Sequence, residues 1–128
     1  MVDKTVVHFE IPAEDVEKLK SFYEGVFNWK ITHTPVGSLD YWLIETVPIN
    51  EKGEPIRPGV NGGIYRKENP QQTPTNYISV DDIDSHISKI KELGGTLVQH
   101  KSHVPGVGYI AVGLDPEGNQ IGMLQGEM

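Results

Sequence analysis

The hydrophobic pattern of the chain changes between two periods, and the order of these changes occurs twice. Residues 5–11 alternate between polar and apolar side chains, which predicts a strand with His8 and Glu10 on its polar face. Residues 15–27 then carry apolar side chains at helical spacing, with Asp15 as the expected N-cap. Three further strands are predicted, over residues 29–34, 41–47 and 60–66.

The second half of the chain follows the same order. A short strand is predicted over residues 77–80, and a helix from Ile83 to Leu93 ends at Gly94-Gly95. Three more strands are predicted, over residues 96–99, 109–114 and 120–125. The Gly- and Pro-containing stretch at residues 50–59 is interpreted as a surface connection rather than a lid.

One constant offset along the chain superimposes the apolar positions of the two halves, so that Ile11 falls on Ile78 and Trp42 on Tyr109. We call this the repeat offset, and it predicts an α+β fold with two βαβββ modules in tandem. The single domain, residues 1–128, divides into module 1 (about 4–66), a linker (about 67–74) and module 2 (about 75–126). Since neither module buries both faces alone, we expect two curved mixed sheets around a shared concave pocket.

Composition and charge narrow the possible partners. Eighteen Asp and Glu against eleven Lys and Arg give a formal net charge of −7, which disfavours nucleic acid and anionic membrane surfaces. The chain has no cysteine, and therefore no disulfide, thiolate nucleophile or sulfur ligand. We expect a cytoplasmic protein whose partners are a small molecule and a second copy of the chain in a homodimer.

The predicted pocket has two groups of candidate residues. His8 and Glu10, with Thr75 and Tyr77 at the offset positions, supply an imidazole, a carboxylate, a hydroxyl and a phenol for binding or proton transfer. A purely structural role for these polar groups is the alternative. Trp42 and Tyr109 are candidates for contact with an organic ligand. Their alternative role is packing in the core or at a dimer interface.

Two other patterns suggest a functional site but lack the residues that such a site would need. His100 and His103 have the spacing of a metal pair, but no carboxylate follows before Asp115, so we interpret them as exposed loop histidines. Residues 105–108 are glycine-rich without a phosphate-binding motif, and we interpret them as a turn.

Four segments resemble the vicinal oxygen chelate superfamily, which contains glyoxalase I, bleomycin resistance proteins and extradiol dioxygenases. These segments are residues 8–11 (HFEI), 21–29 (SFYEGVFNW), 79–84 (SVDDID) and 115–121 (DPEGNQI). They span almost the whole chain, and the resemblance implies the same βαβββ repeat. The chain is similar to the small glyoxalase-like members of that family.

The resemblance also implies four positions for ligands of a divalent metal. His8 matches the first, whereas Thr75 and Gly122 replace two others, and the fourth falls near Gly62, Gly63 or Ile64. One imidazole cannot hold a divalent ion against water, so we expect no metal cofactor. Substitute ligands such as Glu10, His100 or His103 would reverse that expectation.

Three functions follow from these observations, beside the alternative of a protein whose concavity is mostly filled and which acts through assembly. The first is metal-free binding of a small organic molecule, as in bleomycin resistance proteins. The second is a lyase or isomerase of glyoxalase type, in which His8 or Glu10 acts as general base. An extradiol dioxygenase ranks below both, because it requires the missing ligands.

Overall fold

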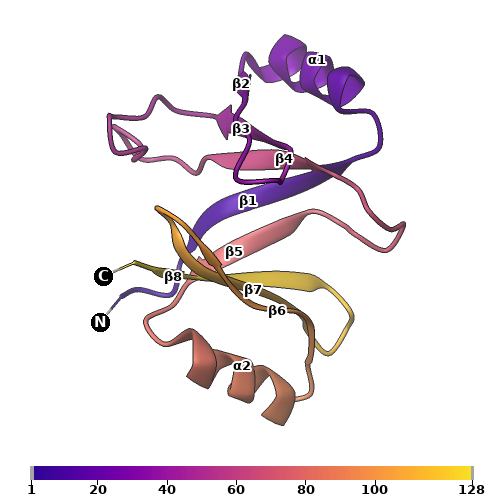
Figure 1. Cartoon of the computed structure of the whole chain (residues 1–128), viewed down its shortest axis with the longest axis vertical. Coiled ribbons are helices and arrows are strands. Elements are labelled where there is room, and N and C mark those ends of the chain that lie inside the picture. The colour runs from indigo at the N-terminus through magenta and orange to yellow at the C-terminus, as the bar shows by residue number, and fades with distance from the viewer. Residues whose placement is uncertain (1, 128) are drawn as a thin grey trace. The chain divides into compact units, whose positions relative to one another are not determined.

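The computed structural model describes residues 2–127, which form two compact units (Figure 1). The first unit comprises His8–Pro74, and the second combines residues 2–7 with residues 75–127. Residues 2–7 therefore group with the second βαβββ repeat, and the backbone N–H of Ser79 donates a hydrogen bond to the carbonyl of Thr5 (2.9 Å). Each unit contains one helix and a four-stranded sheet.

The first unit follows the predicted order of elements. They are β1 (Val6–Ala13), whose first two residues group with the second unit, α1 (Val16–Phe27), β2 (Lys30–His33), β3 (Tyr41–Glu45) and β4 (Gly62–Arg66). The strand order is β2-β3-β4-β1, in which β1 and β4 are parallel and the other pairs antiparallel. Asp15 caps α1 as predicted, because its side chain accepts a hydrogen bond from the backbone N–H of Lys18 (3.1 Å).

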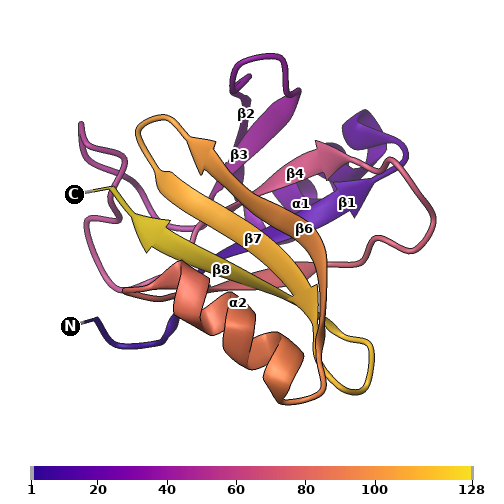
Figure 2. The same cartoon turned by 60° about the horizontal axis from the view of Figure 1, so that its bottom comes forward.

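The second unit repeats this arrangement. It contains β5 (Thr75–Ser79), α2 (Ile83–Glu92), β6 (Thr96–Val104), β7 (Gly108–Leu114) and β8 (Gln120–Gly126), with the strand order β5-β8-β7-β6. Here β5 and β8 are the parallel pair. Figure 2 shows α2 lying along one face of this sheet. The α+β fold with two βαβββ repeats is thus confirmed.

Each unit has its own apolar core between helix and sheet. In the first unit Ile44 and Ile64 are fully buried, and partly buried aromatic side chains from β1 and α1 pack against them. In the second unit Ile83, Ala111 and Met123 are the centre of the corresponding core. Because side chains alternate along a strand, the opposite face of each sheet carries candidate site residues from the sequence: His8 and Glu10 in the first unit, Thr75 and Tyr77 in the second.

Residues 50–59 are exposed throughout and connect β3 to β4 over the surface. The side chain of Asn61, only 9% exposed, anchors this connection. Its carbonyl oxygen accepts hydrogen bonds from the backbone N–H groups of Thr46 (2.7 Å) and Val47 (3.0 Å). No helix within residues 2–127 is both long and apolar enough to cross a membrane.

Candidate functional site

The alternation of β1 separates core residues from candidate site residues in the first unit. Phe9 and Ile11 pack against the core beneath α1. His8 and Glu10 project to the opposite face of the sheet, where their side chains are 28% and 21% exposed. The sequence prediction for these two faces of β1 therefore agrees with the observed packing.

His8 lies at the centre of a hydrogen-bonded group on this face. Its Nε2 is 3.3 Å from a carboxylate oxygen of Glu10 and 2.9 Å from the hydroxyl of Tyr41 on β3. Sequence reasoning missed Tyr41 and selected its neighbour Trp42. The strand alternation carries the relevant signal, because a side chain adjacent to a core residue must face the other way.

Two further ionisable side chains share the face of His8. Tyr65 on β4 is directly opposite Tyr41 in the β3–β4 register. Burial raises the pKa of the Tyr65 phenol above its usual 10.0, and the negative charges of Glu10 and Glu68 raise it further. Glu45, at the other end of β3, lies on the same face as Tyr41. Its side chain is 12% exposed and lies 3.7 Å from the ammonium group of Lys30. We call His8, Glu10, Tyr41, Tyr65 and Glu45 the polar face of the first unit.

Thr75 and Tyr77 occupy the corresponding face of the second unit. They are 3% and 5% exposed, and the Thr75 hydroxyl accepts a hydrogen bond from the side-chain amide of Gln120 (2.7 Å). The Tyr77 ring lies over Gly122 on β8, so closely that a Cβ on this glycine would overlap the ring. The repeat offset thus identified equivalent positions in the two sheets.

Trp42 and Tyr109 project to the helix side of their sheets. Trp42 is 5% exposed in the core of the first unit, with His33 stacked on it at 4.8 Å. Tyr109 packs against the core of the second unit, and the ammonium group of Lys101 lies 5.1 Å from its ring centre. These placements favour the core-packing alternative for both aromatic residues, so neither belongs to the polar face.

His100 and His103 are exposed, as predicted, but they lie on β6 and not in a loop. The strand continues to Val104 because its last three residues pair with β7, and two shifts in the β6–β7 register interrupt the simple alternation. His103 pairs with the carboxylate of Glu127. Residues 105–108 form the predicted turn, closed by a hydrogen bond from the backbone N–H of Val107 to the carbonyl of Val104 (3.0 Å).

The residues at the expected metal-ligand positions do not fit a divalent ion. Gly63 lies beneath the Tyr41 phenol and Gly122 beneath the Tyr77 ring, so tyrosine rings fill the space that ligand side chains would need. The Nε2 of His8 already contacts Glu10 and Tyr41. Within each unit, as far as residues 2–127 define it, no three His, Asp or Glu side chains converge in a way that would hold an ion.

Known proteins resemble this chain in sequence and in fold. A "Glyoxylase-like domain-containing protein" from Didymella fabae is 30% identical over 119 residues, which cover 86% of this chain and 84% of that protein. A hypothetical protein from Bacillus halodurans superimposes with a TM-score of 0.66 at 15% identity, covering 99% of this chain and 97% of the other. Methylmalonyl-CoA epimerase from Mycobacterium tuberculosis gives 0.65 at 12% identity, covering 96% and 88%. At such identities the two structures establish the fold alone.

A family model gives the more specific result. The model of the Glyoxalase/Bleomycin resistance protein/Dioxygenase superfamily matches residues 5–123, which include the first βαβββ repeat, the second as far as the middle of β8, and every residue of the polar face. The chain therefore belongs to the glyoxalase/bleomycin resistance protein/dioxygenase superfamily.

Proposed function

We propose that the protein binds a small organic molecule on the polar face of the first unit, without a divalent metal at the family's ligand positions. The observation that carries this proposal is the contact of His8 with both Glu10 and Tyr41, beside a glycine whose side-chain space the Tyr41 ring fills. The face presents an imidazole, carboxylates and phenols for hydrogen bonds, and aromatic surface for apolar contact.

The charges of the polar face select the kind of molecule. Glu10 and Glu45 contribute two carboxylates, and Lys30 is paired with Glu45. A negatively charged ligand would meet like charge here, whereas an uncharged or cationic molecule would not. We therefore infer that the ligand is an uncharged or cationic aromatic compound.

Thermal unfolding in the presence of chosen probes tests the binding proposal. The probes are a panel of uncharged and cationic aromatic amides, bleomycin, and methylmalonyl-CoA as the anionic comparison. We expect a cationic or uncharged probe to raise the melting temperature, because a ligand stabilises the folded state in proportion to its occupancy. His8→Ala and Tyr41→Phe should weaken the effect, whereas His100→Ala on exposed β6 should leave it unchanged. Stabilisation that survives His8→Ala would contradict the proposal.

Elemental analysis tests the metal-free part of the proposal. The protein is purified without chelators and analysed before and after incubation with nickel, zinc, manganese and ferrous iron. We expect no metal bound at one ion per chain through His8. One metal per chain, lost in His8→Ala, would overturn this part and favour metal-assisted glyoxalase or dioxygenase chemistry.

Proton transfer is the second candidate function, and the geometry around His8 favours it specifically. His8 or Glu10 would remove a proton from a carbon next to a carbonyl group, and the Tyr41 hydroxyl would donate a hydrogen bond to the carbonyl oxygen as charge develops. Exchange of that proton in heavy water, measured on methylmalonyl-CoA and on the stabilising probes, distinguishes the two functions. His8→Ala would abolish exchange by an enzyme but only weaken affinity in a binding protein.

We also propose that the protein is a cytoplasmic homodimer. The absence of cysteine fits a reducing compartment, and β2 and β6 are sheet edges available for pairing. Light scattering after size exclusion gives the mass, and twice the 14.2 kDa of one chain is the expected result.

A further inference from the structure

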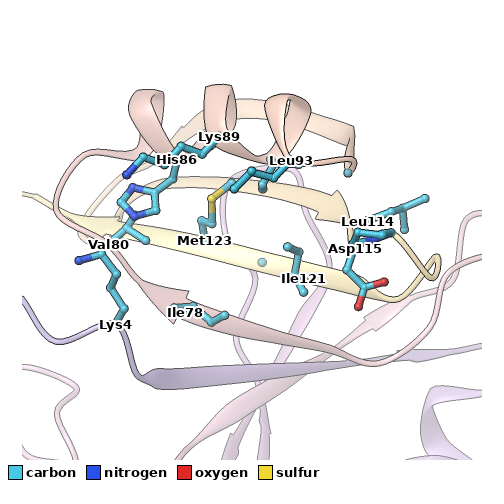
Figure 3. Close-up of a pocket in the computed structure, with 14 residues that line it drawn as sticks. Lys4, Ile78, Val80, His86, Lys89, Leu93, Leu114, Asp115, Ile121 and Met123 are labelled. Atoms are coloured by element: carbon cyan, nitrogen blue, oxygen red, sulfur yellow. The ribbon is translucent and has the colours of Figure 1, made fainter.

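The second unit contains an open apolar groove on the helix side of its sheet, away from Thr75 and Tyr77. Figure 3 shows this groove between α2 and the strands β5 and β8. Its volume is about 360 Å³, which lies within the range of small-molecule pockets. The apolar lining consists mainly of Ile78, Val80, Ile90, Leu93, Ile121 and Met123.

Comparison of the two repeats explains why this groove is open. In the first unit aromatic rings pack between helix and sheet, with Trp29 at 5.1 Å from Tyr23 and 5.8 Å from Phe9, while the exposed Phe27 lies 5.3 Å from Trp29 at the edge. At the positions related by the repeat offset, none of these aromatic residues recurs. Their counterparts are Asn76 for Phe9, Ile90 for Tyr23, Gly94 for Phe27 and Thr96 for Trp29. The second helix therefore covers its sheet without the aromatic rings that pack in the first interface.

The groove has cationic groups at one end and an acidic group at the other. The side chains of Lys4 and Lys89 point toward one end, where the His86 ring also lies, and Asp115 lies at the opposite end (Figure 3). Among the described residues, neither Lys4 nor Lys89 forms an ion pair. This cationic end contrasts with the net charge of −7 of the whole chain.

Asp115 makes one end of the groove negatively charged. Its side chain accepts hydrogen bonds from Asn119 and from the backbone N–H of Glu117, and the bond from the Asn119 side chain is the main reason that the pKa of Asp115 is lowered. The carboxylate stays negative at neutral pH, so an anion is repelled from this end and attracted to the end with Lys4 and Lys89.

We propose that this groove binds a small amphiphilic carboxylate. Its aliphatic tail lies between α2 and the sheet, where it covers the apolar side chains, and its carboxylate lies beside Lys4 and Lys89. Leu93, 74% exposed at the rim, becomes covered when the tail is in place. This site is separate from the polar face of the first unit and does not depend on the function proposed for that face.

Titration calorimetry with octanoate, octanol and octylamine tests the proposal. We expect one octanoate per chain, bound more tightly than octanol and more tightly than octylamine, because octanoate can meet two lysines whereas octylamine can meet only Asp115. The double variant Lys4→Glu/Lys89→Glu should weaken octanoate binding by about tenfold or more, because two attractions become repulsions. Lys91→Glu is the matched control, since this lysine is on the same helix but outside the groove, and it should bind octanoate like the wild type.

A second variant and a spectroscopic measurement separate the groove from other sites. Ile90→Phe returns a ring to the groove and should abolish octanoate binding while the protein stays folded. Methyl signals of Ile78, Ile121 and Met123 should shift on titration. The proposal is overturned by absence of octanoate binding, by equal affinity in the Glu double variant, or by signal changes on the polar face of the first unit. Self-association that Ile90→Phe prevents would also overturn it, because the occupant would then be a second copy of the chain.

Discussion

At the scale of single residues, two glycine–tyrosine pairs recur in the two repeats. Gly63 lies beneath Tyr41 and Gly122 beneath Tyr77, one pair in each unit. The resemblance to the family implied that Gly122 stands at one ligand position and that another falls near Gly62, Gly63 or Ile64. It could not show that tyrosine rings fill the space above them, because that depends on the register between neighbouring strands.

Replacement of Gly122 by alanine tests this packing. The added Cβ would overlap the Tyr77 ring, so we expect Gly122→Ala to lower the free energy of unfolding by about 1–3 kcal/mol. Gly126→Ala on the same strand is the control, because a Cβ there meets no atom within 4 Å. Denaturant unfolding gives both values, and equal stability of the two variants would show that Tyr77 does not lie against Gly122.

The pKa of Tyr65 reports the electrostatics of the polar face. Burial raises it above 10.0, and the charges of Glu10 and Glu68 contribute to the rise. We expect Glu10→Gln to lower the pKa of Tyr65 part of the way toward its ordinary value, because one of the two negative charges is removed. Ultraviolet titration, with Tyr65→Phe to identify the signal, measures the change. Glu92→Gln on α2 is the control, and an identical response to both variants would exclude the effect of Glu10.

At the scale of elements, the type and order of every helix and strand could be predicted, whereas some boundaries could not. The prediction ended β6 at residue 99, but the strand runs to Val104; the irregular register interrupts its alternation, so the pattern did not indicate the remaining residues. The helix predicted over residues 15–27 agrees with α1, which ends at Phe27 before Asn28, a residue with a φ of 60°. Pairing with β7 decided the end of β6, and the local sequence does not encode that pairing.

The turn between β7 and β8 provides a pH-dependent test. The lowered pKa of Asp115 means that its stabilisation of the turn is complete above the unfolded-state pKa, about 3.9, and is lost as the pH falls through the folded-state value. We expect Asp115→Ala to lower the melting temperature at neutral pH, and the difference from the wild type to shrink in acid. Asp81→Ala, outside the turn, is the control. A difference that stays constant down to acid pH would contradict this account.

At the scale of the whole molecule, the repeat in the sequence corresponds to two units with separate cores. The repeat offset predicted the matching strands and helices, but not that residues 2–7 group with the second unit. That grouping depends on pairing between segments far apart in the chain, such as the hydrogen bond from Ser79 to Thr5. The shared concave pocket expected between the repeats stays a prediction.

The uneven distribution of aromatic rings also has a spectroscopic consequence. Both tryptophans of the chain, Trp29 and Trp42, belong to the first unit, where they pack in or against its core. Intrinsic tryptophan emission is therefore a label that reports on one half of the molecule, without any engineered fluorophore. Comparing its unfolding curve with that of far-ultraviolet circular dichroism, which averages over both halves, shows directly whether the two repeats lose their structure together.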